Sequence, residues 1–169
     1  MKTNQRRISL VLIGIGILQM LFYAPRLPEH MASHFGGSGD PNGWSGKAAF
    51  FGIYAGILVM VFLLFHALPG LLSRFPDAMI NLPNKEYWLA PERRASTFSR
   101  IKDYFVSMGI GLIIFLLFTL QLVIQANLRE DRHLDSTVLW ILLVVFAVFT
   151  IVWSIRFIRM FRMQAGQSR

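Results

Sequence analysis

The sequence contains no cysteine, few acidic residues and almost no charge within its longest apolar stretches. The lack of cysteine excludes disulfides, thiolate catalysis and cysteine-ligated metals. Polar residues within the apolar stretches are few, among them Gln19, His66 and Gln121, and none is an acid or a base near the middle of the membrane. Because ion-coupled transporters and membrane proteases place ionisable groups inside the membrane, both classes are disfavoured.

Apolar residues make up 54% of the 169 residues, which is too many for the surface of a soluble protein of this size. They form four continuous runs, each near the roughly 20 residues that a helix needs to cross the hydrocarbon core. Continuous runs favour helices over the alternating strands of a membrane barrel. We therefore predict an all-α membrane protein, a single domain over residues 1–169. Its predicted transmembrane helices span about residues 8–25, 47–68, 103–126 and 137–158.

Positive charge predicts the orientation of these helices. Most of the 17 lysine and arginine residues lie before the first run, between the second and third runs, or after the fourth. Loops rich in these residues stay in the cytoplasm, so both termini are predicted to be cytoplasmic. The net charge of +8 is spread over helix flanks instead of one soluble domain, which predicts contact with the lipid bilayer and no nucleic-acid partner.

The connecting segments differ in composition. Residues 26–46 form the predicted outer loop, whose Pro, Gly, Ser and Asp content predicts irregular backbone. The cytoplasmic segment 69–102 begins with several prolines, which predict loop or short turns in its first half. Pro91 suits the first position of a helix that continues into the third span. In the short outer loop 127–136, Asp135 or Ser136 can cap the fourth helix.

Two histidines of the outer loop are four residues apart in the sequence. If this stretch is helical, His30 and His34 share one face and could bind a metal with Glu29 or Asp40. The HExxH arrangement is missing and no third ligand is definite, so we predict no metal and no other cofactor. A metal-dependent membrane enzyme that uses His30 and His34 is the alternative.

We expect the outer loop to be a folded cap rather than a flexible tether. Its turn-forming residues can specify tight turns, and burial of the Trp44 ring near the membrane interface would anchor it. Lys47 begins the second helix with its charge near water. The outer candidates for binding a ligand or partner are His30, His34, Asp40, Asn42, Trp44 and Lys47.

A second group of candidates lies in the cytoplasmic segment. A run of turn formers, charges and aromatic rings could dock a partner, or it could lie at the interface with its two rings in the head groups, which we favour. Its candidate residues are Asn84, Lys85, Glu86, Tyr87 and Trp88. In the second helix, Ala48, Gly52 and Gly56 form a small-xxx-small stripe, which we expect to pack inside the chain rather than in a homo-oligomer.

The outer loop also carries a family resemblance. Its residues Leu27, Pro28, His34, Phe35, Gly39, Pro41, Gly43, Trp44 and Lys47 follow the first predicted helix. This pattern resembles the domain of unknown function 1648 of SdpI-type immunity proteins, over about residues 8–56. Residues 81–88 resemble a segment that some small members carry after their second helix.

The resemblance implies a multi-pass protein of the bacterial inner (plasma) membrane without established catalysis. SdpI itself confers immunity to a secreted toxin and sequesters a regulator, although SdpI proteins are longer and have extra helices. The function predicted from the sequence is a noncatalytic binding or sensing role of this kind. The alternatives are an accessory subunit of a larger membrane complex, with a membrane protein as its partner, and the metal-dependent enzyme.

Overall fold

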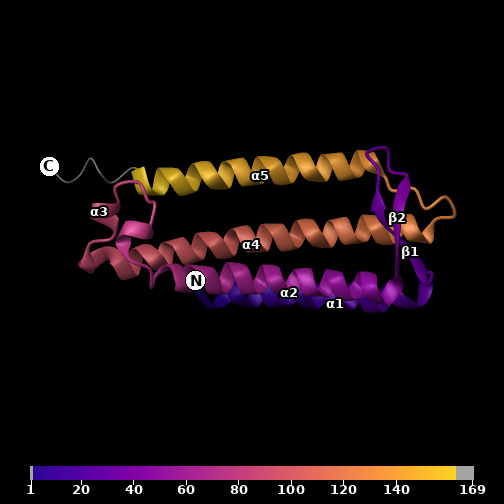
Figure 1. Cartoon of the computed structure of the whole chain (residues 1–169), viewed down its shortest axis with the longest axis horizontal. Helices are drawn as coiled ribbons and strands as arrows, with labels where there is room; N and C mark the ends of the chain where they lie inside the picture. Colours follow the sequence, from indigo (N-terminus) through magenta and orange to yellow (C-terminus); the bar gives the residue numbers. More distant parts are fainter. Residues whose placement is uncertain (1, 163–169) are drawn as a thin grey trace.

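The computed structural model describes residues 2–162, and four long helices run side by side along its length (Figure 1). All four are long and apolar enough to cross a membrane, as predicted. Their bounds are α1 Lys2–Tyr23, α2 Lys47–Leu72, α4 Pro91–Leu128 and α5 Ser136–Arg162. The shorter elements are η1 Ala24–Arg26, β1 His30–Phe35, β2 Pro41–Gly46, η2 Asp77–Met79 and α3 Lys85–Trp88.

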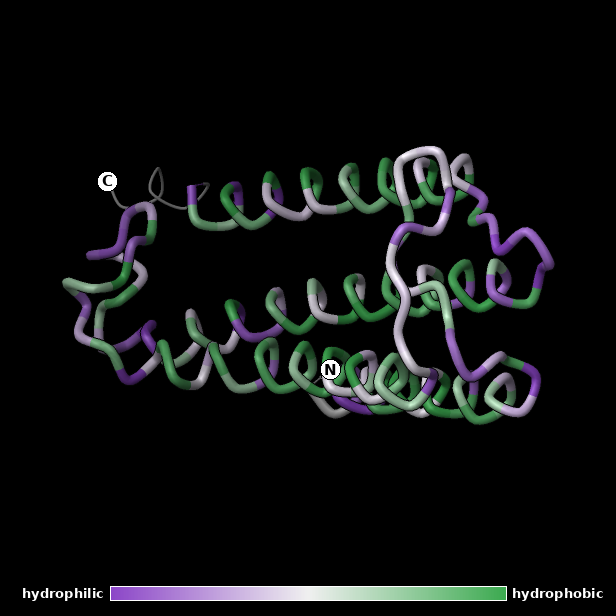
Figure 2. The backbone as a smooth tube through the Cα atoms, turned by 45° about the vertical axis from the view of Figure 1, so that its right-hand side comes forward, coloured by the Kyte–Doolittle hydropathy of each residue, from purple (hydrophilic) through white to green (hydrophobic). Residues whose placement is uncertain are grey.

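Hydrophilic residues gather at the two ends of this bundle, and the helices between them are mostly hydrophobic (Figure 2). One end carries strands β1 and β2 and the loop between α4 and α5, and we call it the hairpin end. The other carries the amino end of α1, α3 and the carboxyl end of α5, and we call it the termini end (Figure 1). This division follows from the long apolar runs, since polar side chains are costly in hydrocarbon.

Helix α4 is the centre of the packing and contacts α1, α2 and α5. The main core lies where α1, α2 and α4 meet, and Leu58, Ile113, Leu120 and Ile124 are almost completely buried in it. Helix α5 packs against α4 at one side, and Phe161 is its only buried residue within the described chain. The bundle is therefore a three-helix core with α5 attached to α4.

Close approach between helices depends on glycines other than those of the predicted stripe. A Cβ on Gly109 would lie 2.7 Å from the Cβ of Phe65, so α2 and α4 pack closely there. At Gly52 and Gly56 a Cβ would meet nothing within 4 Å, and Ala48 is exposed as well. The expectation that the stripe packs inside the chain is therefore wrong for the described residues, because α2 turns its other face, which carries Tyr54 and Leu58, toward the core.

The two segments next to the long helices match the predictions in part. Helix α4 begins at Pro91 and continues unbroken through the third span, and Asp135 caps α5 by accepting a hydrogen bond from the Val138 N–H at 3.1 Å. Both predictions are confirmed. The predicted break at Pro69 is wrong, since α2 continues to Leu72. A proline near the end of a helix removes only one backbone hydrogen bond, and the Ser73 N–H still bonds to the Pro69 carbonyl at 3.2 Å.

The outer segment contains an antiparallel hairpin, so the prediction of irregular backbone was wrong for residues 30–46. Strands β1 and β2 pair with His30 opposite Gly46 and Ala32 opposite Trp44, and the register shifts beyond Ala32. Gly39 closes the tip with φ +102°, a conformation that favours glycine. The hairpin crosses the ends of the helices from α2 toward α5 (Figure 1).

Candidate functional site

The hairpin is held on α4 by one buried side chain. The Asn127 amide oxygen accepts from the Ala32 N–H at 2.8 Å, and its amide nitrogen donates to the Ala32 carbonyl at 2.9 Å. Asn127 also donates to the Val123 carbonyl at 2.9 Å. The amide thus pairs with β1 as another strand would, and Met31 and Ala32 are fully buried beside it.

Sequence reasoning missed Asn127 because it assigned this residue to the outer loop. The residue lies instead in the last turns of α4. The available signal was an uncharged hydrogen-bonding side chain at the edge of an apolar run, where each polar group must find a partner. Which partner it finds depends on a strand that lies 95 residues away in the sequence.

The loop between α4 and α5 ties the hairpin a second time. Arg132 donates to the His30 carbonyl at 2.9 Å, and the Leu134 N–H donates to the Gly39 carbonyl at 2.9 Å. His133 Nδ1 lies 3.2 Å from a carboxylate oxygen of Asp40. These contacts join two segments that both lie at the hairpin end, and we call them, with the Asn127 bonds, the hairpin clasp.

Asp40 accepts from two sides within the hairpin clasp. The hydroxyl of Ser38 donates to one carboxylate oxygen at 2.7 Å, and His133 contacts the other. The hydrogen bond from Ser38, followed by that from His133, lowers the pKa of the Asp40 carboxyl below its ordinary value. Because both groups contact the carboxylate and the histidine is not placed beside the hydroxyl, the three residues do not form a nucleophile activated by a base.

The other outer candidates lie near the hairpin but do not converge on one centre. The Asn42 amide oxygen contacts His34 Nδ1. Lys47 forms an ion pair with Glu29 at 2.8 Å and donates to the Leu27 carbonyl at 3.2 Å. This ion pair lowers the pKa of the Glu29 carboxyl. Lys47 therefore ties the first residues of α2 to the chain that precedes β1.

Trp44 is exposed, and the prediction that its burial anchors the loop is wrong. Its exposed fraction is 53%, and the Arg132 guanidinium lies 5.1 Å from the ring centroid. Strand β1 is the strand that packs against α4, so its side chains Met31 and Ala32 provide the burial instead. A cation above an exposed ring contributes only a modest stabilisation.

The histidine pair does not have the arrangement that a metal would need. His30 and His34 lie on a strand with an irregular register rather than on one face of a helix. Within residues 2–162, no group of three or more His, Asp or Glu side chains is close enough to hold a metal ion. The helical geometry on which the metal alternative depended is therefore absent from this part of the chain.

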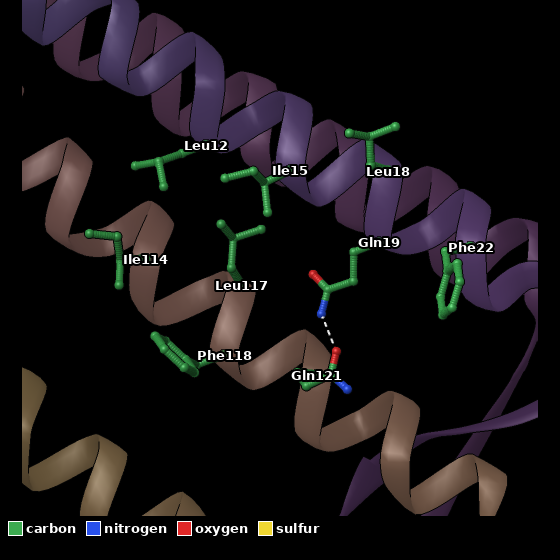
Figure 3. Close-up of a pocket in the computed structure, with 9 residues that line it drawn as sticks. All are labelled: Leu12, Ile15, Leu18, Gln19, Phe22, Ile114, Leu117, Phe118 and Gln121. Atoms are coloured by element: carbon green, nitrogen blue, oxygen red, sulfur yellow. Dashed lines mark hydrogen bonds between the residues drawn. The ribbon is translucent and has the colours of Figure 1, made fainter.

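A groove lined mainly by apolar side chains runs between α1 and α4. Its volume is about 710 Å³, and seven of its nine lining residues are apolar (Figure 3). The lining residues are Leu12, Ile15, Leu18, Gln19, Phe22, Ile114, Leu117, Phe118 and Gln121. Several of these side chains are largely exposed, so the groove opens on the side of the bundle that the hydrocarbon would cover.

Two glutamines meet across this groove. Gln19 of α1 donates to the Gln121 amide oxygen on α4 at 2.6 Å, and Gln121 donates to the Tyr23 hydroxyl at 3.2 Å (Figure 3). Among the described residues, none donates a hydrogen bond to the amide oxygen of Gln19. An amide oxygen without a donor is costly in an apolar environment, so an occupant of the groove with an N–H or O–H group would be stabilised there.

The termini end is closed by a small apolar core. Trp88 is 4% exposed, packs edge-on against Phe161 and donates to the Phe161 carbonyl at 2.9 Å. Asn84 donates to the same carbonyl at 3.2 Å. The prediction that the Trp88 ring lies in the head groups is wrong, because this ring joins α3 to the end of α5 instead. We call these contacts the aromatic lock.

The remaining candidates of residues 84–88 lie at the surface of the termini end. Tyr87 lies under the Arg93 guanidinium, 3.9 Å from the ring centroid to the cation. It lines a polar hollow of about 720 Å³ together with Asn84, Lys85 and Glu86. Docking of a partner on these residues stays a prediction.

Comparison with known families identifies one region of the chain. Residues 11–65 match the family described as Domain of unknown function (DUF1648). This region covers most of α1, the hairpin and much of α2, which is about a third of the chain. One wall of the groove thus belongs to the matched region and the other wall, on α4, does not. No curated protein and no solved structure matches the chain significantly.

Proposed function

We propose that this chain is a noncatalytic protein of the bacterial inner membrane that binds an apolar peptide segment in the groove between α1 and α4. The role resembles that of SdpI-type immunity proteins. The observation that carries the proposal is the pair of glutamines in an otherwise apolar groove, where no described residue donates to the Gln19 amide oxygen. The match to DUF1648 over the wall formed by α1 supports it.

A peptide suits this groove better than a lipid tail. An acyl chain would fill the apolar lining but has no hydrogen-bond donor for Gln19. A membrane-embedded peptide can fill the same volume and place a Ser, Thr, Asn or Trp donor against the amide, as helices do in membranes. The ligand is therefore an apolar segment with one polar donor.

Binding without catalysis agrees with the chemistry of the lining. Its side chains are aliphatic, aromatic or amide groups, and none is a nucleophile or a general base. The glutamine pair lies toward the hairpin end, next to Tyr23. With the termini in the cytoplasm, as the positive charge predicts, this places the pair in the outer half of the membrane, where a secreted ligand would enter.

The proposal can be tested with a photo-crosslinking amino acid at Phe118 in the groove and, as a control, at Val145 on α5. Both side chains are 60% exposed and both would face hydrocarbon, but only Phe118 lines the groove. The probe is a synthetic transmembrane peptide of about 20 residues, Leu and Ala with one central Ser. We expect crosslinking at position 118 to exceed that at position 145 severalfold.

The role of the glutamines has its own control. Gln19→Leu should weaken crosslinking to the serine peptide by about threefold to tenfold, the range of one hydrogen bond in a membrane. Gln125→Leu on the exposed face of α4 should leave it unchanged. Equal crosslinking at positions 118 and 145, or equal binding of a peptide with Ala in place of Ser, would contradict the proposal.

An accessory subunit of a larger membrane complex is the second candidate, and helix α5 favours it. This helix has one buried residue in the described chain and presents a long apolar face that includes Val144, Val148 and Ile151. Copurification of a second membrane protein in mild detergent, lost when Val144 and Val148 are both changed to Trp, would support this candidate. A purified chain that remains alone in mild detergent would contradict it.

A further inference from the structure

A small cavity at the termini end has a chemistry unlike that of the groove. It lies where α1, α2 and α4 meet, and its volume is about 70 Å³. Its lining residues are Gln5, Arg6, His66, Lys102, Asp103 and Val106. Each of the three core helices therefore contributes a polar or charged side chain to one partly open cavity, and two of its residues, Arg6 and Lys102, are exposed.

The two cations of this cavity are not neutralised by a contact ion pair. Within the part of the chain that the structure describes, no carboxylate lies within 4.0 Å of the charged groups of Arg6 or Lys102. The neighbouring Asp103 lines the cavity, and its backbone carbonyl accepts from the Gln5 amide at 3.3 Å. Two cations close together repel each other, so an anion between them would be stabilised.

His66 adds an unsatisfied atom to the same cavity. Its Nδ1 lies 2.9 Å from the Phe62 carbonyl, which can only accept, so Nδ1 carries a proton. The other ring nitrogen, Nε2, is buried and has no hydrogen-bond partner among the described residues. A buried polar atom in this state calls for a ligand or a water molecule.

We propose that this cavity binds the phosphate group of an anionic ligand. A phosphate offers several acceptor oxygens for Arg6, Lys102 and the Gln5 amide, whereas a carboxylate offers only two. Because Nδ1 of His66 carries the proton, Nε2 can only accept, and its donor would be a hydroxyl of the same ligand, either the P–OH of hydrogen phosphate or a hydroxyl of the head group. The cavity holds a group of this size and is too small for a lipid tail. The phosphate of a phospholipid head group and that of a soluble phosphate ester have the same chemistry, and the experiment separates these sources.

The position of the cavity agrees with a head group. It lies within the first turns of α1 and where α4 enters its long apolar run, so it is at the level at which the helices would leave the hydrocarbon. Basic residues near a membrane surface attract anionic lipids in general. General attraction would depend on all the basic residues near the surface. Binding in the cavity would depend on Arg6 and Lys102 in particular.

The test uses the full chain in an uncharged detergent with two probes, inorganic phosphate and a short-chain phosphatidylglycerol. Binding is measured by the shift of the melting temperature and by the imidazole NMR signals of His66. Arg6→Gln and Lys102→Gln should each weaken binding by about tenfold or more, the loss expected for one charge-assisted hydrogen bond. Arg7→Gln and Arg100→Gln remove the same charge from exposed positions outside the cavity and should change binding by less than about twofold.

Asp103→Asn is expected to tighten binding. Misfolding would weaken binding, so tighter binding cannot be a result of misfolding. Removing the one carboxylate from the lining should tighten binding of both probes by about threefold or more. Cavity-dependent binding of phosphatidylglycerol alone would assign the head group, and that of inorganic phosphate alone would assign a soluble ester. Binding of neither probe, equal losses in Arg6→Gln and Arg7→Gln, or weaker binding by Asp103→Asn would overturn the proposal.

Discussion

The two ends of the bundle are held together by different kinds of contact. At the hairpin end, the hydrogen bonds of the hairpin clasp, including the Asp40–His133 contact, join β1 and the hairpin tip to α4 and to the following loop. At the termini end, the aromatic lock buries Trp88 against Phe161, and Leu89, Phe98 and Ile101 complete that core. The hairpin clasp is mainly polar and lies beside the buried Met31 and Ala32, whereas the aromatic lock is mainly apolar and includes two hydrogen bonds to the Phe161 carbonyl.

This difference indicates which end of the bundle is sensitive to pH and salt. The Asp40–His133 contact is mostly exposed, so pH and salt change its strength. Apolar burial at the termini end does not titrate and changes little with salt. In our proposal the ligand enters the groove near the hairpin end. The hairpin clasp at this end consists of separate hydrogen bonds, each of which can break without the others.

The largest expected effect compares one tryptophan from each end. Trp88→Ala should destabilise the docking of α3 on α5 by about 3–5 kcal/mol, because a fully buried aromatic ring and its hydrogen bond are lost. Trp44→Ala removes a ring that is 53% exposed and should cost about 1 kcal/mol or less.

Limited proteolysis in detergent measures this comparison at both ends. Cleavage within residues 73–90 should accelerate in Trp88→Ala, and cleavage within residues 26–46 should change little in Trp44→Ala. We compare the increase in cleavage rate over the wild type in the two variants. A larger increase within residues 26–46 in Trp44→Ala than within residues 73–90 in Trp88→Ala would contradict the prediction.

The next effect concerns the polar end. Asn127→Ala should destabilise the hairpin by about 2–3 kcal/mol, because the N–H and the carbonyl of Ala32 lose their side-chain partner inside a buried site. Gln125→Ala is the matched control, since Gln125 is exposed on the same helix two residues earlier. Hydrogen exchange of the Ala32 amide measures the change. Protection that survives in Asn127→Ala would show that apolar burial alone holds β1.

The smallest effect is a dependence on pH at the hairpin end, where Asp40 lies. The ionised Asp40 carboxylate is favoured in the folded chain, so its pKa is lower there than in the unfolded chain. Its contribution is present at neutral pH and is lost as the pH falls through the acid range, between about pH 5 and pH 2. The protection factor of the Leu134 amide, which bonds to Gly39, should fall over that range.

Two variants sharpen the same measurement. Because the hydrogen bonds from Ser38 and His133 both lower the pKa of the Asp40 carboxyl, Ser38→Ala and His133→Ala should each reduce the pH dependence. The Leu89 amide at the termini end, which bonds to the Lys85 carbonyl at 2.7 Å, is the internal control. A parallel loss of protection at Leu89 would indicate global unfolding and refute a local effect.

Local sequence patterns predicted the features that depend on neighbouring residues only. Continuous apolar runs indicated four helices, Pro91 marked the beginning of α4, and Asp135 marked the beginning of α5. Such signals work because the bilayer length, the missing N–H of proline and the capping oxygen act within a few residues of each other.

Local patterns did not predict the environment of side chains that are compatible with solvent, with lipid or with a distant segment of the chain. Trp44 and Trp88 are both tryptophans near a helix end. The sequence predicted burial of the Trp44 ring in the folded outer loop and a head-group position for the Trp88 ring. In the structure one ring is exposed beneath Arg132 and the other is buried against Phe161. The stripe of Gly52 and Gly56 failed for the same reason, since any helix has several faces and only packing selects one.

The sequence by itself determined that four helices are long and apolar enough to cross a membrane, because the free energy of placing side chains in hydrocarbon is summed locally along each run. Only the tertiary structure decided that Asn127 pairs with Ala32, that Gln19 meets Gln121, and that the cavity of Arg6 and Lys102 exists. These contacts join residues about 100 positions apart in the chain. Their formation depends on which helix faces turn toward one another, and that choice is made by the packing of the whole core around α4.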